Sequence, residues 1–141
     1  MKLLPSKKTS PHFRDVACAV IFQAGKILIA RRRKNVHMGG LWEFPGGKRM
    51  APESLGACLE REVLQELGIR VKPLQLLKKT DYLYPDRGVS LYFYECEFLG
   101  GSLYAFGCQE FRWVWPFELK KYAFPPANEA ILNYLRKAKH A

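Results

Sequence analysis

Two glutamates, Glu62 and Glu66, stand four residues apart in a stretch with the apolar spacing of an α-helix. Residues at that spacing lie one above the other on the same helix face. Like charges there destabilise a helix by roughly 0.2–0.5 kcal/mol. A hard cation that prefers carboxylate oxygens, such as Mg²⁺, would turn that cost into a gain. A solvated acidic helix face is the simpler interpretation of the two glutamates considered alone.

The helix that must position these glutamates is expected to begin near Pro52 and to end at Gly68. Proline is tolerated in the first helical turn, and glycine is common just after the last turn. Apolar residues at helical spacing predict one buried face. They are Leu55, Cys58, Leu59, Val63 and Leu67.

A glycine loop precedes this helix. Phe44 comes before Pro45 and therefore avoids the helical region of backbone space, which predicts the end of a strand. Gly46 and Gly47 allow positive φ and leave the backbone open to a ligand. A strand end, a glycine loop and an acidic helix thus follow one another within residues 42–69.

This stretch resembles the Nudix box, G-x5-E-x7-R-E-U-x-E-E-x-G-U, in which U is a large aliphatic residue. One position departs, because Gln65 stands where the family has the first glutamate of its E-E pair. The resemblance implies an α/β fold, the Nudix fold, with a mixed β-sheet sandwiched between helices (α/β/α). The matching positions are Gly47, Glu53, Arg61, Glu62, Val63, Glu66, Gly68 and Ile69.

The resemblance also implies a metal site and a hydrolytic activity. Glu62, Glu66 and the Gly46 carbonyl are the expected ligands of Mg²⁺, with Mn²⁺ as the alternative ion. Gln65 occupies a further ligand position of the family. Glu62 is also the candidate general base, oriented by Arg61.

A narrower resemblance, to the MutT branch, covers most of residues 15–137. MutT proteins hydrolyse 8-oxo-dGTP to 8-oxo-dGMP and pyrophosphate with Mg²⁺, which removes the oxidised nucleotide before DNA replication can use it and belongs to DNA repair. In that branch the asparagine that matches Asn128 hydrogen-bonds the oxidised base. The similar segments are Arg31-Arg32, His37-Met38, Trp42 to Lys48, Tyr84 to Arg87, and Phe124 to Glu129.

The MutT resemblance implies further substrate-binding residues. Arg32 is expected to face phosphate or sugar, His37 to approach the nucleotide, and Phe44 to line the base pocket. Lys48 would attract the anionic substrate. Asp86 and Arg87, on a predicted hairpin, would lie near the base. For Asp86, a purely structural role in the turn is nearly as well supported.

Three further positions bear on catalysis. Glu53 is a Nudix-box position and is grouped with Glu62 and Arg61 as a catalytic residue. Its expected contribution is to brace the loop and the helix. MutT relatives carry another glutamate before the strand that contains Trp113, and by spacing it falls on Gly107, with Glu110 close but shifted. One or two carboxylates plus substrate phosphates usually suffice for Mg²⁺. We therefore expect activity, and leave open whether it is reduced or uses fewer metal ions.

The chain has 141 residues, enough for one domain with a sizeable core, and a formal net charge of +10. Basic proteins of this size usually bind phosphate-bearing partners. Lysines and arginines at the two ends explain part of the charge, but the basic run 31–34 lies inside the domain. We expect a flexible basic arm over residues 1–13 and a single Nudix hydrolase domain over 14–141.

The remaining elements follow from local patterns. We expect a final helix from Pro126, a helical turn over Pro116–Lys121, and turns at Ala24-Gly25, Pro85 to Gly88 and Gly100-Gly101. Expected strands are Asp15–Gln23, Lys26–Arg32, Val71–Thr80, Val89–Phe98 and Phe111–Trp115.

Cysteine usage and hydropathy indicate a cytoplasmic protein. No C-x-x-C pair is present, which argues against zinc, and we expect reduced thiols. The N-terminus has no apolar segment typical of a signal peptide, and no apolar run approaches membrane-spanning length. We expect a monomer with no membrane partner. The cysteines are Cys18, Cys58, Cys96 and Cys108.

Other functions stay open at this point. The basic charge favours an RNA 5′-pyrophosphohydrolase or a broad (d)NTP pyrophosphohydrolase. A module that only recognises oxidised guanine, or a catalytically inactive regulatory Nudix fold, is a non-enzymatic alternative. Gln65 and Gly107 support the inactive fold, and Gln65 also has the form of a deliberate inactivating change.

Overall fold

One mixed sheet of seven strands forms the centre of the computed structural model, which describes residues 13–137. Its main strand order is β3-β2-β1-β6-β5, with β4 paired to β1 and β7 paired to β2. The strands are β1 (Phe13–Gln23), β2 (Lys26–Arg31), β3 (Trp42–Glu43), β4 (Gly46–Lys48), β5 (Ile69–Tyr84), β6 (Arg87–Gly101) and β7 (Glu110–Val114).

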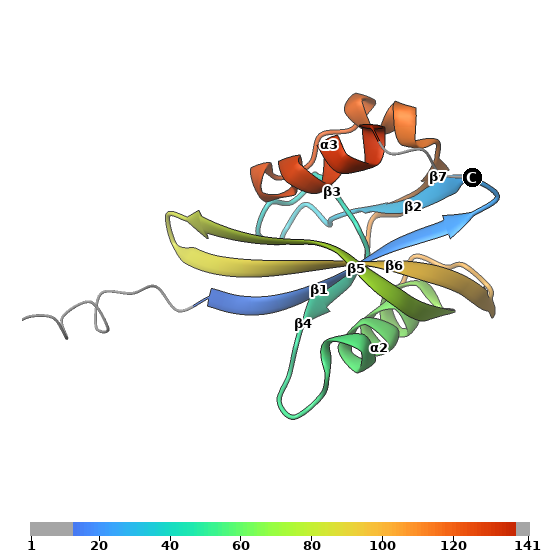
Figure 1. The fold of residues 1–141 in the computed structure, drawn as a ribbon, viewed down its shortest axis with the longest axis horizontal. Helices are drawn as coiled ribbons and strands as arrows, with labels where there is room; N and C mark the ends of the chain where they lie inside the picture. The colour runs from blue at the N-terminus through green and yellow to red at the C-terminus, as the bar shows by residue number, and fades with distance from the viewer. Residues whose placement is uncertain (1–12, 138–141) are drawn as a thin grey trace, which may run out of the picture.

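Helices cover both faces of this sheet, as Figure 1 shows. The long helix α2 (Leu55–Leu67) lies on one side, and α3 (Glu129–Lys137) lies on the other. Two short 3₁₀ helices, η1 (Pro116–Lys121) and η2 (Pro126–Asn128), precede α3. The predicted α/β/α arrangement is therefore confirmed.

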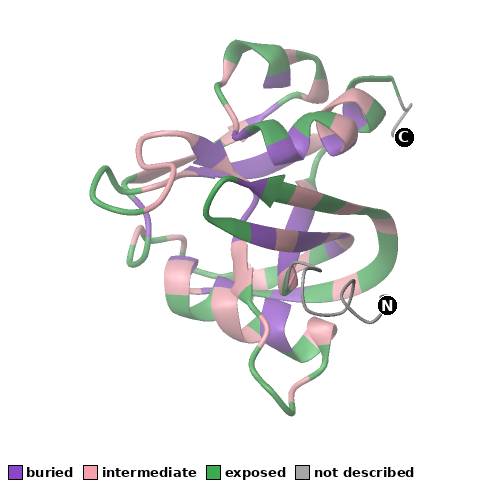
Figure 2. Cartoon of the chain, turned by 90° about the vertical axis from the view of Figure 1, so that its left-hand side faces the viewer, coloured by how far each residue is buried: buried purple, intermediate pink, exposed green. Residues whose placement is uncertain are grey.

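The central strand β1 divides the core in two, because its side chains alternate between the faces of the sheet. Ala19 and Ile21 belong to the buried cluster that contains the apolar face of α2. Cys18 and Val20 belong to the cluster that contains the buried residues of α3. Purple segments on the strands and on one face of α2 mark these layers in Figure 2.

A split in the sheet brings the glycine loop against β1. Phe22 of β1 pairs with Ile27 of β2, whereas Cys18 pairs with Gly46 of β4 on the same side of the strand. Between these two pairings, the Ala19 N–H donates to the Pro45 carbonyl oxygen at 2.7 Å. The loop thus replaces β2 as the neighbour of β1 over this part of the strand.

The expected course of α2 is confirmed except at its start. The helix begins at Leu55 rather than near Pro52, because the Ser54 hydroxyl accepts a hydrogen bond from the Ala57 N–H at 3.1 Å and caps it. Its end is as predicted, with Gly68 in the left-handed region at φ 73°.

Two other sequence expectations were wrong in detail. Gly100 and Gly101 form no turn but lie within β6, where they pair with Arg70 and Ile69 of β5. The last helix does not start at Pro126, since η2 comes first and α3 begins at Glu129.

The two ends of the chain lie mostly outside the described residues. The expected arm over 1–13 falls there apart from Phe13, which begins β1 and pairs with Gly88. In the part of the chain that the structure describes, no helix is long and apolar enough to cross a membrane. All four cysteines are buried, and none is joined to another in a disulfide.

Candidate active site

A pocket of about 890 Å³ opens beside the split in the sheet, within the size range typical of small-molecule sites. Three of the predicted site residues, Glu53, Arg61 and Gln65, do not line it. Those that do are Arg32, His37, Phe44, Gly46, Lys48, Glu62, Glu66, Asp86, Arg87 and Asn128.

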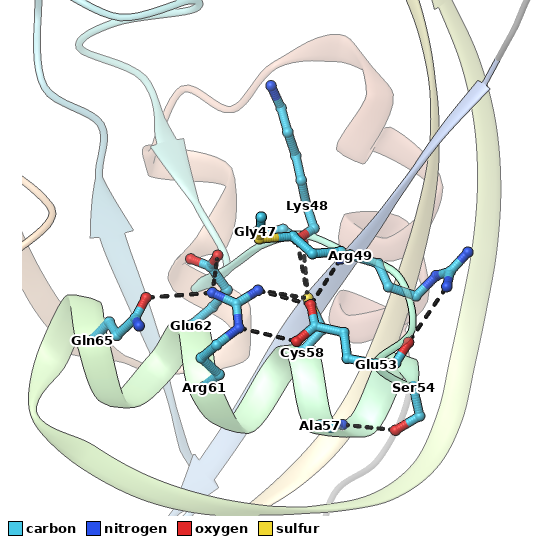
Figure 3. A network of polar contacts seen from close by, with 11 residues as sticks. Gly47, Lys48, Arg49, Glu53, Ser54, Ala57, Cys58, Arg61, Glu62 and Gln65 are labelled. Atoms are coloured by element: carbon cyan, nitrogen blue, oxygen red, sulfur yellow. Dashed lines mark hydrogen bonds and ion pairs between the residues drawn. The ribbon is translucent and has the colours of Figure 1, made fainter.

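Glu62 lies against the glycine loop in this pocket. A Cβ atom at Gly47 would come within 2.5 Å of the Glu62 Cδ, so only glycine allows this approach. The Arg61 guanidinium donates to the Glu62 Oε2 at 2.9 Å (Figure 3). The loop and the arginine together fix the carboxylate at the pocket wall.

Arg61 connects this carboxylate to the loop before α2. It donates two hydrogen bonds to the Glu53 carboxylate, at 3.0 and 2.8 Å, and Glu53 also accepts from the Met50 N–H at 2.8 Å. These hydrogen bonds lower the pKa of Glu53 to about 2, and those from Arg61 make the largest contribution. Gln65 is exposed, and its Oε1 accepts from Arg61 at 3.4 Å on the far side of the guanidinium from Glu53.

Glu66 is the second pocket carboxylate of α2. Its pKa is raised to about 8, chiefly by burial and next by the nearby carboxylates of Glu43 and Glu62, while a hydrogen bond from the Gly46 backbone opposes the shift. Carboxylates that repel one another in a partly buried site fit a divalent cation. Within residues 13–137, no group of three His, Cys, Asp or Glu side chains is arranged to hold a metal. One or two carboxylates are the usual protein contribution to a Mg²⁺ site.

Glu43 is a third pocket carboxylate, and the sequence interpretation gave it no role. It accepts a hydrogen bond from Arg32 Nη1 at 2.7 Å, while Arg32 Nε donates to the His37 carbonyl oxygen at 2.8 Å. Burial raises the pKa of Glu43, and Arg32 opposes that shift. The sequence feature that could have identified Glu43 is its position as a single charged residue between the apolar residues Trp42 and Phe44.

His37 lines the pocket with one ring nitrogen unsatisfied. Its Nε2 is buried and has no hydrogen-bond partner within the described residues. Its ring stands edge-on to that of Tyr84, with centroids 5.4 Å apart. A buried nitrogen without a partner costs free energy, and His37 is also one of the residues that line the pocket.

Asn128 lines the pocket beside the apolar residues Phe44 and Pro125, and it is only 7% exposed. Its Nδ2 donates to the Pro125 carbonyl oxygen at 3.3 Å. Because a carbonyl oxygen only accepts, the amide nitrogen must face Pro125 and the Oδ1 is left for another donor. The Phe44 ring, between those of Phe93 and Phe124, forms the neighbouring wall.

Charged residues at the mouth of the pocket differ in their pairing. Asp86 and Arg87, at the tip of the hairpin between β5 and β6, form an exposed ion pair at 3.2 Å. Lys48 is also exposed, and its side chain extends from the glycine loop away from α2 (Figure 3).

The expected substitute glutamate lies elsewhere. Glu110 forms ion pairs with Arg31 at 3.2 Å and Arg112 at 3.3 Å, and it does not line the pocket. Gly107 is the residue beside the site, since a Cβ atom there would come within 2.9 Å of the Glu66 Cγ. The position that spacing matched to a glutamate of the MutT relatives thus lies against Glu66, and here it has no side chain.

Known proteins share both the sequence pattern and this architecture. The model of the NUDIX domain matches residues 16–134. The chain belongs to the NUDIX domain family. The expected Nudix hydrolase fold and enzyme class are thereby confirmed, and Nudix hydrolases use a divalent metal ion and act on nucleotides.

Individual Nudix relatives cover most of the chain. An 8-oxo-dGTP diphosphatase of Escherichia coli (strain K12) is 34% identical over 112 residues, which is 79% of this chain and 87% of that protein. A CTP pyrophosphohydrolase of the same strain is 33% identical over 119 residues, or 84% and 88% of the two chains. The solution structure of the E. coli ORF135 protein superposes with a TM-score of 0.80 at 33% identity, covering 94% and 96%.

Proposed function

We propose that this Nudix hydrolase is a Mg²⁺-dependent pyrophosphohydrolase that converts 8-oxo-dGTP to 8-oxo-dGMP and pyrophosphate. It acts as a monomer in the cytoplasm, with its single domain over residues 14–141, and removes oxidised nucleotide from the precursor pool of DNA. Support comes from the pocket described above and from the similarity to an 8-oxo-dGTP diphosphatase.

The orientation of the Asn128 amide is the observation that carries the choice of base. Its Nδ2 is held by the Pro125 carbonyl, so its Oδ1 accepts from the ligand. Ordinary guanine presents an acceptor at N7, whereas the oxidised ring carries an N–H there. The amide oxygen therefore attracts the oxidised base and repels the normal one, and a buried site of this kind discriminates strongly.

The carboxylate end of the pocket supports hydrolysis of the phosphate chain. Glu62, Glu66 and the Gly46 carbonyl would hold Mg²⁺, which neutralises phosphate charge and activates water. The Glu62 carboxylate takes the proton of the attacking water, and Arg61 holds that carboxylate in place through the bond at 2.9 Å. Water oxygen bonds to phosphorus as the bond to the leaving pyrophosphate breaks.

A substrate panel tests this function. With Mg²⁺, pyrophosphate release from 8-oxo-dGTP should exceed that from dGTP, CTP, other triphosphates and triphosphate-ended RNA. Asn128→Ala should reduce the preference for 8-oxo-dGTP over dGTP by at least about tenfold, the effect of one specific hydrogen bond. Asn133→Ala is the matched control, because Asn133 lies on α3 outside the pocket.

Each other outcome of the panel contradicts the proposal in a different way. Binding of 8-oxo-dGMP without any turnover would identify a recognition module, and a preference for RNA ends would identify an RNA 5′-pyrophosphohydrolase. Equal losses in the two asparagine variants would remove Asn128 from base recognition.

A second candidate function is hydrolysis of a pyrimidine triphosphate. It is supported by the 33% identity to a CTP pyrophosphohydrolase over 84% of the chain. In that case CTP is turned over faster than 8-oxo-dGTP in the same panel, and Asn128→Ala leaves the ratio of oxidised to normal purine unchanged.

A further inference from the structure

The floor of the pocket continues along β1 beyond the carboxylates. Arg14, Val16 and Cys18 alternate along this strand and all line the pocket, whereas the residues between them do not. Cys18 pairs with Gly46 at the glycine loop. At about 3.3 Å per residue, Arg14 lies roughly 13 Å further along the strand than Cys18. It is therefore placed to contact a part of the ligand remote from Glu62 and Glu66.

Lys48 lies beside Arg14 on the same face. Lys48 of β4 is directly opposite Val16 of β1, so Arg14 is its diagonal neighbour, within reach of a long side chain. Both side chains are exposed and line the pocket. Two cations in this position repel each other, and a bound anion would offset that repulsion.

These two cations differ from the other charged residues of the pocket. Arg32 is paired with Glu43 at 2.7 Å, and Arg87 is paired with Asp86 at 3.2 Å. Within residues 13–137, neither Arg14 nor Lys48 takes part in an ion pair. Their charge is thus available to a ligand.

A second, smaller hollow of about 500 Å³ adjoins this end and shares Arg14 and Met50 with the pocket. It also contains Arg49, which Asp15 holds at 3.0 Å. The hollowed surface therefore extends past Arg14, and because Asp15 and Arg49 offset each other there, its unpaired charge is that of Arg14.

We propose that Arg14 is a substrate-binding residue and forms, with Lys48, a subsite for the two terminal phosphates of the triphosphate. This inference rests on the proposed pyrophosphohydrolase activity and names the part of the substrate that the outer pocket binds. The subsite holds the phosphates that depart as pyrophosphate, so it favours triphosphates over diphosphates and makes pyrophosphate a competitive inhibitor.

Arg14→Gln tests the subsite, with Arg70→Gln as the matched control. Arg70 is exposed on β5 and does not line the pocket, so the control loses the same charge elsewhere. Inorganic pyrophosphate should inhibit Arg14→Gln about five- to tenfold more weakly than it inhibits wild type or the control, as expected for a charged contact at a partly solvated site. Inhibition by 8-oxo-dGMP, which has no terminal phosphates, should stay unchanged.

Two further measurements strengthen the comparison. KM for the triphosphate should rise in Arg14→Gln while KM for the diphosphate changes little. Arg14→Lys should restore most of the pyrophosphate affinity, because it keeps the charge. Thermal unfolding should be nearly the same in all variants, since exposed substitutions usually change stability little.

Failure of the subsite can be told from failure of the proposed activity. If wild type hydrolyses triphosphates and Arg14→Gln matches Arg70→Gln in pyrophosphate inhibition, the subsite is wrong and the activity stands. If wild type hydrolyses none, calorimetric titration with pyrophosphate still decides. Weaker binding only in Arg14→Gln supports the subsite, and equal binding in both variants overturns it.

Discussion

The Glu62 carboxylate occupies the space that a side chain at Gly47 would need. A Cβ atom at Gly47 would lie 2.5 Å from the Glu62 Cδ and 2.6 Å from its Oε1. The glycine of the loop and the glutamate of α2 therefore form one unit, in which a small residue on one element sets the position of a carboxylate on the other.

Gly47→Ala should displace this carboxylate and lower kcat by about tenfold or more, because a shift of about 1 Å at a reacting group has effects of this size. KM for the nucleotide should change less, since the added methyl group displaces the Glu62 carboxylate and not Asn128 at the base end. Steady-state kinetics on the preferred triphosphate measures both constants.

Gly56→Ala is the matched control for that variant. Gly56 lies in α2, and a Cβ atom there would meet only Pro73 Cγ, at an ordinary 3.9 Å. Alanine in a helix is favoured over glycine by up to about 1 kcal/mol, so this control should keep its activity and gain stability. Equal activity in Gly47→Ala and Gly56→Ala would show that the close approach to Glu62 is not needed for catalysis.

The protonation of Glu66 predicts how stability depends on pH without divalent metal. Its pKa is raised from 4.5 to about 8, chiefly by burial, so the folded protein binds this proton more tightly than the unfolded chain. Its contribution to the free energy of unfolding is full below pH 4.5 and is lost as pH rises toward 8. Glu66→Gln should therefore be more stable than wild type at pH 8, by at least about 1.4 kcal/mol, the value of one pKa unit.

Thermal unfolding between pH 5 and 8.5, with chelator present, measures this effect. Glu60→Gln is the control, because Glu60 is an exposed glutamate of the same helix outside the pocket. Wild type and the control should lose stability over this range while Glu66→Gln changes less. The same slope in all three proteins would contradict the raised pKa.

The parts of the site that the sequence could predict are those held within one stretch of chain. Helical spacing alone places Glu62 and Glu66 on one face, and both line the pocket. The exception was the helix start, where the hydroxyl of Ser54 outweighed the proline signal at Pro52. Local patterns decide helix faces well, whereas helix ends depend on competition between neighbouring capping residues.

The parts that could not be predicted depend on pairing between distant segments. Arg14 lines the pocket only because β1 pairs with β4 and β6, and no local pattern contains that register. Glu43 reaches the carboxylates because β3 pairs with β2 and Arg32 satisfies its charge. Gly107 was placed by resemblance alone, and only the three-dimensional structure shows that it faces Glu66.

Arg61→Lys should separate positioning from chemistry. Arg61 bonds Glu53 twice and Glu62 once, and a lysine, which has no planar fork, cannot reproduce that geometry. We expect kcat to fall about tenfold, as for loss of an oriented catalytic group, with a smaller change in KM. Arg70→Lys, an exposed exchange on β5, should match wild type. A rise in KM with unchanged kcat would assign Arg61 to substrate binding instead.

Gln65→Glu tests whether the departure from the Nudix box limits metal binding. Gln65 lies on the outer side of Arg61, which already bonds its Oε1 at 3.4 Å, and it does not line the pocket. A carboxylate there adds negative charge near Glu62 and Glu66. An exposed charge of this kind contributes about 1 kcal/mol or less to metal binding, so we expect the Mg²⁺ concentration for half-maximal activity to fall a few-fold.

Titration of activity with Mg²⁺ measures this, with Glu60→Gln as the control for a charge change elsewhere on α2. An unchanged Mg²⁺ requirement would mean that Glu62 and Glu66 hold the metal without help from position 65, and that the glutamine has little effect on catalysis.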